Sequence, residues 1–152
     1  MAWLSDTNIL LRMAQPAHAM HEEALQAVER LLERGEQVCI VPQNITEFWN
    51  VATRREGSAN GLGMTVAEAH EEVRRISTFL TLLPETERIY PEWLDLVVTH
   101  SVSGIDVYDA RLVAAMRVYG VGNLLTFDVH DLARYADIRI LQPKDVLKAY
   151  SQ

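Results

Sequence analysis

The sequence predicts an α/β protein, a three-layer α/β/α sandwich around a short parallel sheet. Short apolar runs of strand length alternate with longer stretches of helical spacing along the 152 residues, which is the pattern of parallel strands joined by helices. A hydrophobic fraction of 49% allows one sizeable core, and the length is too short for two ordinary domains. We therefore expect a single domain over residues 1–152.

Five runs have the length and composition of short buried strands, and turn or charged residues bound each of them. Because predicted helices separate them, we expect the strands to run parallel. The five runs are Ala2–Ser5, Gln37–Val41, Thr81–Leu83, Asn123–Thr126 and Asp137–Ile140.

Three helices are predicted in the first half, after a short one that starts near Asn8. The stretch from His18 to Arg34 carries apolar residues at helical spacing and stops at Gly35. A second helix begins near Asn44 and gives way to a glycine-rich loop over residues 56–63. A third opens with Thr65 and Glu68 in capping-box spacing and runs to about residue 79.

Three more helices are predicted in the second half, and terminal signals mark the first two. The stretch Pro91–His100 begins with proline, and Val107–Val118 is followed by Gly120, as helix starts and stops commonly are. The stretch Pro143–Tyr150 is the last helix.

The composition is typical of a protein in a reducing, aqueous compartment. Cys39, the single cysteine, lies in an apolar run, and neither a signal peptide nor a membrane span is apparent. We therefore expect a soluble, cytoplasmic protein. The formal charge of -7 argues against a protein that coats nucleic acid, which usually carries a basic patch. It does not exclude a nuclease, because bound divalent cations reverse the local field.

Acidic residues follow the predicted strands. In open parallel sheets, ligands bind outside the carboxyl ends of the strands. Asp6 follows the first strand, Glu47 is expected in the first turn of the next helix, Asp109 opens a later helix, and Asp128 follows the fourth strand. Four acids from four segments are therefore expected to converge.

Each acid also has a purely structural interpretation. Asp6 suits a helix cap, and Glu47 suits the far end of a capping box that starts at Asn44. Asp106 is expected to cap the helix that contains Asp109. Asp131 is expected to pair with Arg134, one turn further on, which leaves Asp128 as the better site candidate.

Convergence on one sheet edge favours a metal site over a set of unrelated caps. Carboxylates repel one another unless a cation binds or their pKa rises, and oxygen ligands of this kind suit Mg²⁺ or Mn²⁺. Two such ions about 3.5 to 4 Å apart can orient and ionise water and stabilise a leaving oxygen in phosphodiester hydrolysis. Thr126 and Asn8 are candidate supports that hydrogen-bond the carboxylates or a bound water.

Four segments, in order, resemble the signature segments of PIN-domain nucleases, and the resemblance spans nearly the whole chain. Within that superfamily, a small stand-alone domain looks like the toxin of VapBC-type toxin–antitoxin pairs. The four segments are residues 4–11 (LSDTNILL), 44–51 (NITEFWNV), 107–116 (VYDARLVAAM) and 125–132 (LTFDVHDL).

The resemblance implies an endoribonuclease that depends on Mg²⁺ or Mn²⁺ and acts on single-stranded RNA. It also implies a homodimer and a small antitoxin that covers the acidic groove. Asp106 departs from the family pattern, which leaves open whether it or Asp131 joins the metal ligands. The implied catalytic residues are Asp6, Glu47, Asp109 and Asp128, and Asp6, Asp109 and Asp128 are the implied metal ligands.

Other functions fit parts of the pattern. Aspartate-based phosphoryl-transfer folds are disfavoured, because Asn8 stands where one such motif needs a second aspartate and no lysine precedes Lys144. An RNA-processing nuclease and a non-catalytic binding domain remain as alternatives. Phosphate contacts are expected from arginine, whose planar fork suits phosphate oxygens. The candidates are Arg54, Arg55 and Arg111.

Overall fold

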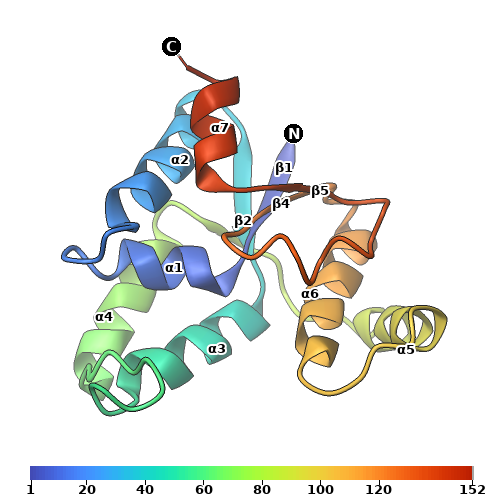
Figure 1. Ribbon diagram of the computed structural model, residues 1–152, viewed down its shortest axis with the longest axis horizontal. Coiled ribbons are helices and arrows are strands. Elements are labelled where there is room, and N and C mark those ends of the chain that lie inside the picture. The colour runs from blue at the N-terminus through green and yellow to red at the C-terminus, as the bar shows by residue number, and fades with distance from the viewer. Residues whose placement is uncertain (152) are drawn as a thin grey trace.

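The computed structural model describes residues 1–151 and has the predicted fold class. Its five strands form one all-parallel sheet in the order β3-β2-β1-β4-β5 (Figure 1). The last strand begins two residues later than predicted, because Ile138 still belongs to a turn in which its N–H bonds the Tyr135 carbonyl. The strands are β1 (Ala2–Ser5), β2 (Gln37–Ile40), β3 (Thr81–Leu82), β4 (Asn123–Leu125) and β5 (Arg139–Leu141).

Helices lie where the sequence predicts them, with shifts of two or three residues at three starting points, one of which is Ile89 in place of Pro91. The helix predicted from His18 begins at His21, because a turn occupies the residues between them and the His21 N–H bonds the His18 carbonyl. The helix predicted from Asn44 begins two residues earlier, at Pro42, since proline suits the first helical position. The helices are α1 (Thr7–Met13), α2 (His21–Glu33), α3 (Pro42–Thr53), α4 (Val66–Ser77), α5 (Ile89–Thr99), α6 (Asp106–Tyr119) and α7 (Pro143–Ala149).

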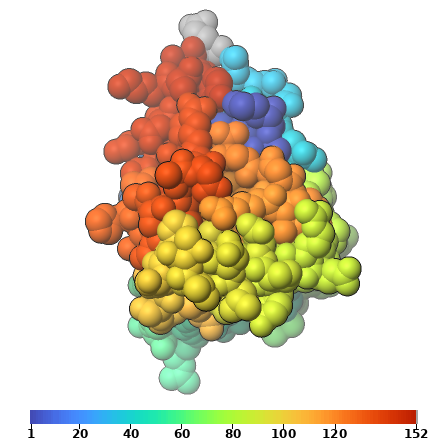
Figure 2. Space-filling view, turned by 90° about the vertical axis from the view of Figure 1, so that its right-hand side faces the viewer, coloured from blue at the N-terminus to red at the C-terminus, as the bar shows by residue number. Residues whose placement is uncertain are grey.

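The helices cover both faces of the sheet. Five of them (α1, α2, α3, α4 and α7) pack on one face, and α5 and α6 pack on the other (Figure 1). Successive strand residues point to opposite faces, so Trp3 is buried in the first core and Leu4 in the second. Cys39 is buried in the second core as a free thiol. Figure 2 faces the side of the molecule on which α5 and α6 lie, and α5 forms much of the surface there.

The parallel arrangement brings the carboxyl ends of the strands to one edge. The chain order reverses between β1 and β4, because β2 and β3 extend the sheet in one direction and β4 and β5 in the other. The Asp6 N–H bonds the Leu125 carbonyl at 2.9 Å, which aligns the ends of these two central strands. Ligands of open α/β sheets bind at such a reversal point.

No helix within residues 1–151 combines the length and the apolar character that a membrane crossing requires.

Candidate active site

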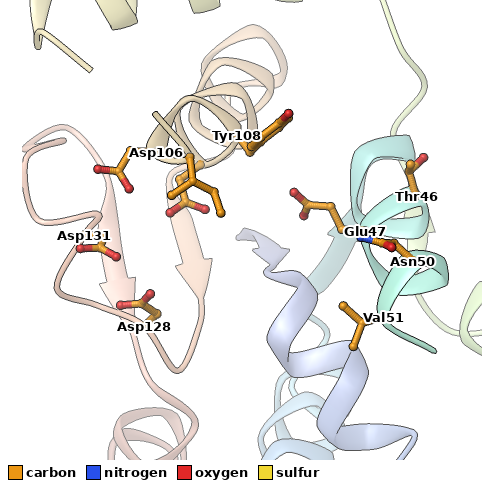
Figure 3. Close-up of a pocket in the computed structure, with 10 residues that line it drawn as sticks. Thr46, Glu47, Asn50, Val51, Asp106, Tyr108, Asp128 and Asp131 are labelled. Carbon is orange, nitrogen blue, oxygen red and sulfur yellow. The ribbon is translucent and has the colours of Figure 1, made fainter. Parts of the chain in front are cut away.

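A cavity of about 670 Å³ opens at this edge of the sheet. Helix α3 forms one wall, and the first turn of α6 together with the segment after β4 forms the other (Figure 3). Five of its ten lining residues are acidic. The lining consists of Thr46, Glu47, Asn50, Val51, Ile105, Asp106, Tyr108, Asp109, Asp128 and Asp131.

Asp6 is not among the lining residues and is 8% exposed, but it lies close enough for its charge to act on Asp109. It is the N-cap of α1, as one of the two interpretations predicts, and its Oδ1 accepts a 2.7 Å hydrogen bond from the Thr7 N–H. Its other oxygen, Oδ2, accepts a 2.7 Å bond from the Thr126 hydroxyl. Asp6 therefore caps a helix and also joins β1 to β4 at the cavity.

Thr126 is the centre of a hydrogen-bond network between the two strand ends. Its hydroxyl donates to Asp6 and accepts from the Asn8 side-chain amide at 3.1 Å and from the Asp128 N–H at 3.0 Å. The Asn8 carbonyl oxygen in turn accepts from the Phe127 N–H at 3.2 Å. Thr126 thus contacts a site carboxylate directly, whereas Asn8 bonds Thr126 and the backbone and no carboxylate.

Glu47 lies in the second turn of α3, because the helix begins at Pro42, so the prediction of a first-turn position was wrong. Its Oε1 accepts a 2.7 Å bond from the Thr7 hydroxyl. The expected capping box with Asn44 was also wrong, since the Asn44 Oδ1 accepts from the Val41 N–H and its amide donates to Thr7. Glu47 is therefore held by α1 and aimed into the cavity (Figure 3).

Gln43 joins the two walls of the cavity, a role that the sequence analysis missed. Its side-chain amide donates to Glu47 Oε2 at 3.2 Å and to the Tyr108 carbonyl at 2.8 Å. Its carbonyl oxygen accepts from Arg111 at 3.4 Å. The spacing of four residues between Gln43 and Glu47 was a visible signal for the first contact, but the contact with Tyr108 depends on how α3 and α6 pack.

Asp109 shares the first turn of α6 with Asp106. The prediction that Asp106 caps this helix was wrong, because the helix begins at Asp106 itself and Ile105 is the N-cap. The predicted pair between Asp131 and Arg134 was wrong too, since Arg134 bonds Asp106 at 3.4 Å. One carboxylate oxygen from each of Asp106, Asp109 and Asp131 lies within 4.8 Å of the other two.

The pKa values of two aspartates at the site are raised by burial and by neighbouring negative charges. The pKa of Asp109 is raised to about 7. Burial is the largest cause, and the negative charges of Asp6, Glu47, Asp128 and Asp106 add to it. Burial also raises the pKa of Asp6 to about 6, against the opposing hydrogen bonds from Thr126 and Thr7.

The donor set suits a divalent cation. Among the residues that the structure describes, no lysine, arginine or histidine lines the cavity. The acids are therefore left largely uncompensated, and the charged atoms that the lining offers are carboxylate oxygens. Hard divalent ions such as Mg²⁺ and Mn²⁺ prefer such ligands, and a bound cation relieves the repulsion that raises these pKa values.

The arginines predicted to contact phosphate do not line the cavity. Arg54 donates to the Ala59 carbonyl at 2.6 Å within its own loop. Arg111 forms an ion pair with Glu85 at 2.9 Å besides its contact with Gln43. Arg55 is exposed on the loop that follows α3.

Comparisons with known proteins agree with the fold. The family model described as the PIN domain matches residues 4–138. A search of curated protein sequences finds no match.

Solved structures of similar fold include toxin–antitoxin proteins. VapBC2 of Rickettsia felis, solved with a promoter DNA fragment, is 11% identical with a TM-score of 0.66, over 93% of this chain and 98% of that one. VapBC-1 of nontypeable Haemophilus influenzae is 14% identical with a TM-score of 0.66, over 95% and 99%. VapC20 of Mycobacterium tuberculosis, a toxin that cleaves the sarcin–ricin loop, is 21% identical with a TM-score of 0.64, over 88% and 95%.

Proposed function

Because the chain belongs to the PIN domain family, whose model spans residues 4–138, we propose that it is a metal-dependent endoribonuclease that cuts single-stranded regions of RNA. The observation that carries this proposal is the convergence of acids from three segments, α3, α6 and the segment after β4, on one cavity at the carboxyl edge of the sheet. Neighbouring acids contribute to the raised pKa values of Asp6 and Asp109, so the cavity suits a cation and the phosphate that a cation attracts.

The proposed ligands of a Mg²⁺ or Mn²⁺ ion are Asp6, Asp109 and Asp128. Such an ion, when bound, supplies positive charge for a phosphodiester and makes water easier to ionise. Asp106 and Asp131 lie close enough to Asp109 to share this cation.

Glu47 is proposed as the residue that accepts a proton from the attacking water. The Thr7 hydroxyl and the Gln43 amide hold its two oxygens in position. Thr126 holds Asp6 and the Asp128 backbone in register. The three arginines remain proposed phosphate contacts outside the cavity.

We further propose that the protein is the toxin of a VapBC-type pair. The resemblance in fold to VapBC proteins and to an RNA-cleaving VapC toxin supports this role. An acidic cavity in a chain of charge -7 suits a small antitoxin that covers it with basic residues. An RNA-processing nuclease without an antitoxin is the alternative, and a short neighbouring reading frame for a DNA-binding antitoxin distinguishes the two.

A homodimer that works in the cytoplasm completes the proposal. Tyr90, Leu94 and Val98 follow one stripe of α5 at intervals of four residues and are 63%, 43% and 72% exposed. Contiguous apolar surface of this kind commonly marks a protein interface. Cys39 is buried and unpaired, which suits a reducing compartment.

RNA cleavage by the purified protein tests the function. Structured RNAs that include transfer RNA are incubated with Mg²⁺ or Mn²⁺, with chelator, and with a variant that combines Asp6→Asn and Asp109→Asn. We expect discrete cuts that require the metal and fall by at least about 10³-fold in the variant, because metal assistance contributes several kcal/mol to the barrier.

A matched control changes two acids outside the cavity, Glu71→Gln and Glu72→Gln on α4, and should cut like the wild type. A folded wild-type protein that binds neither metal would contradict the catalytic proposal and favour a non-catalytic binding domain. Metal binding without cleavage of these RNAs, in protein free of antitoxin, would point to a narrower substrate.

A further inference from the structure

The cavity has an uncharged side that the proposed metal chemistry does not use. Five of its lining residues carry no charge and lie beside the acids on both walls. Thr46, Asn50 and Val51 belong to α3, and Ile105 and Tyr108 belong to the start of α6 (Figure 3). A cavity of about 670 Å³ lies in the range that encloses ligands of drug-like size. Ions and a phosphate group alone are smaller than that.

The side chains of Tyr108 and Ile105 expose apolar surface to solvent in the cavity. Tyr108 is 56% exposed and Ile105 is 82% exposed. They alternate with Asp106 and Asp109 along the chain, so the same turn of α6 presents acids and an aromatic ring to one cavity. The apolar surface therefore lies directly beside the carboxylates that the proposed function assigns to the metal.

The backbone that carries Tyr108 is fixed before any ligand binds. Its carbonyl accepts the 2.8 Å hydrogen bond from Gln43, which ties the first turn of α6 to α3. The tyrosine side chain has few rotatable bonds, so ordering it costs little entropy. An exposed aromatic ring carried by such a fixed backbone is a stacking surface for a flat ligand.

We infer that Tyr108, with Ile105 beside it, forms a base-binding subsite in which one unpaired nucleobase adjacent to the scissile phosphate stacks on the tyrosine ring. This inference rests on the proposed RNA cleavage and adds how the strand is held. The exposed Asn50 amide on the opposite wall offers a hydrogen-bond donor and an acceptor to a base edge.

The subsite selects for single strands. Bases in a duplex are stacked and paired, so their faces are closed to a side chain, whereas a loop or a free end presents them. Stacking on an aromatic ring tolerates all four bases. Tyr108 is thus expected to favour unpaired RNA without dictating its sequence.

The test measures KM and kcat with a labelled single-stranded RNA and with copies that carry one abasic ribose on either side of the cut. Tyr108→Ala should raise KM for the intact RNA by roughly 5- to 150-fold, the range for loss of one base–aromatic stack. Tyr108→Phe should retain most of the affinity, because the ring remains. Val66→Ala removes an exposed apolar side chain from the start of α4, outside the cavity, and should change nothing.

The abasic RNAs separate base stacking from a general loss of structure. For the wild type, one abasic position should raise KM by the same factor as Tyr108→Ala, and the variant should cut that RNA with no further loss. An equal KM increase on every RNA, or no increase at all, would overturn the subsite. So would a variant that cuts RNA normally but escapes its antitoxin, because Tyr108 would then be a protein contact. A wild type that cuts no RNA would overturn the proposed function and the subsite together.

Discussion

Helix α4 and the cavity at the sheet edge are both rich in acids, but they arrange them differently. On α4, Glu71 pairs with Arg74 at 3.0 Å and Glu72 pairs with Arg75 at 2.8 Å, each three residues along the helix. In the cavity, acids from α3, α6 and the segment after β4 face one another. The described contacts of these lining acids include one ion pair, between Asp106 and Arg134.

The difference appears in the direction of the pKa shifts. Hydrogen bonds from the Thr65 backbone and side chain lower the pKa of Glu68 at the start of α4. Burial and neighbouring charges raise the pKa of Asp109 to about 7. Local hydrogen-bond donors therefore favour the charged form of Glu68, whereas burial and the charges of acids from distant segments disfavour the charged form of Asp109.

The largest expected effect comes from the threonine that organises the cavity. Thr126→Val removes the donor to Asp6 and the acceptor for Asn8 and Asp128 while it keeps the shape of the side chain. Loss of a group that orients a metal ligand typically costs about 10- to 100-fold in metal affinity or activity. We expect a loss of this size in Mn²⁺ binding by calorimetry and in RNA cleavage. Thr78→Val, on the C-cap of α4, is the control, and equal losses in both variants would contradict the assigned role.

A medium effect is expected on stability as a function of pH without metal. The pKa of Asp109 is higher in the folded protein, about 7, than its ordinary value of 3.8, so ionisation opposes folding. The cost is absent below about pH 4 and complete above about pH 7, so stability should fall as pH rises between these values. Asp109→Asn should therefore stabilise the metal-free protein at pH 8 by on the order of 2 kcal/mol, after allowance for partial exposure.

Urea unfolding with and without Mg²⁺ checks this expectation. The ion should stabilise the wild type at pH 8 and have much less effect at pH 4, where Asp6 and Asp109 are protonated. It should stabilise Asp109→Asn much less. A metal-free wild type that gains stability between pH 4 and pH 8 relative to Asp109→Asn would contradict the raised pKa.

The smallest effect is expected on α4 itself. Glu71→Gln removes an exposed ion pair, and such pairs contribute about 0.5 kcal/mol or less. The free energy of unfolding should change by no more than that, with no dependence on Mg²⁺. Mg²⁺-dependent destabilisation of this variant would show that the cation acts on acids generally and would remove the distinction between the two regions.

Local signals predicted most of the elements, because their causes lie close together in sequence. Thr65 and Glu68 form the capping box that their spacing predicts, and the helix before Gly120 ends there with glycine in the left-handed conformation. The errors concern partners. Arg134 lies three residues after Asp131 yet pairs with Asp106, and Glu47 is bonded by Thr7 instead of Asn44. Sequence spacing favours a hydrogen-bond or ion-pair partner nearby in the chain, whereas tertiary packing placed a partner from another element closer in space.

The sequence by itself determined the alternation of strands and helices, the parallel sheet that follows from it, and the family to which the chain belongs. It also predicted that four acids converge at the carboxyl edge of the sheet; of these, Glu47, Asp109 and Asp128 line the cavity and Asp6 does not. Only the tertiary structure decided that Thr126 holds Asp6, that Gln43 joins α3 to α6, and that Asp131 lies beside Asp106 and Asp109. The physical reason is that periodicity and capping act within a few residues, whereas these contacts depend on the positions of side chains from segments far apart in the chain.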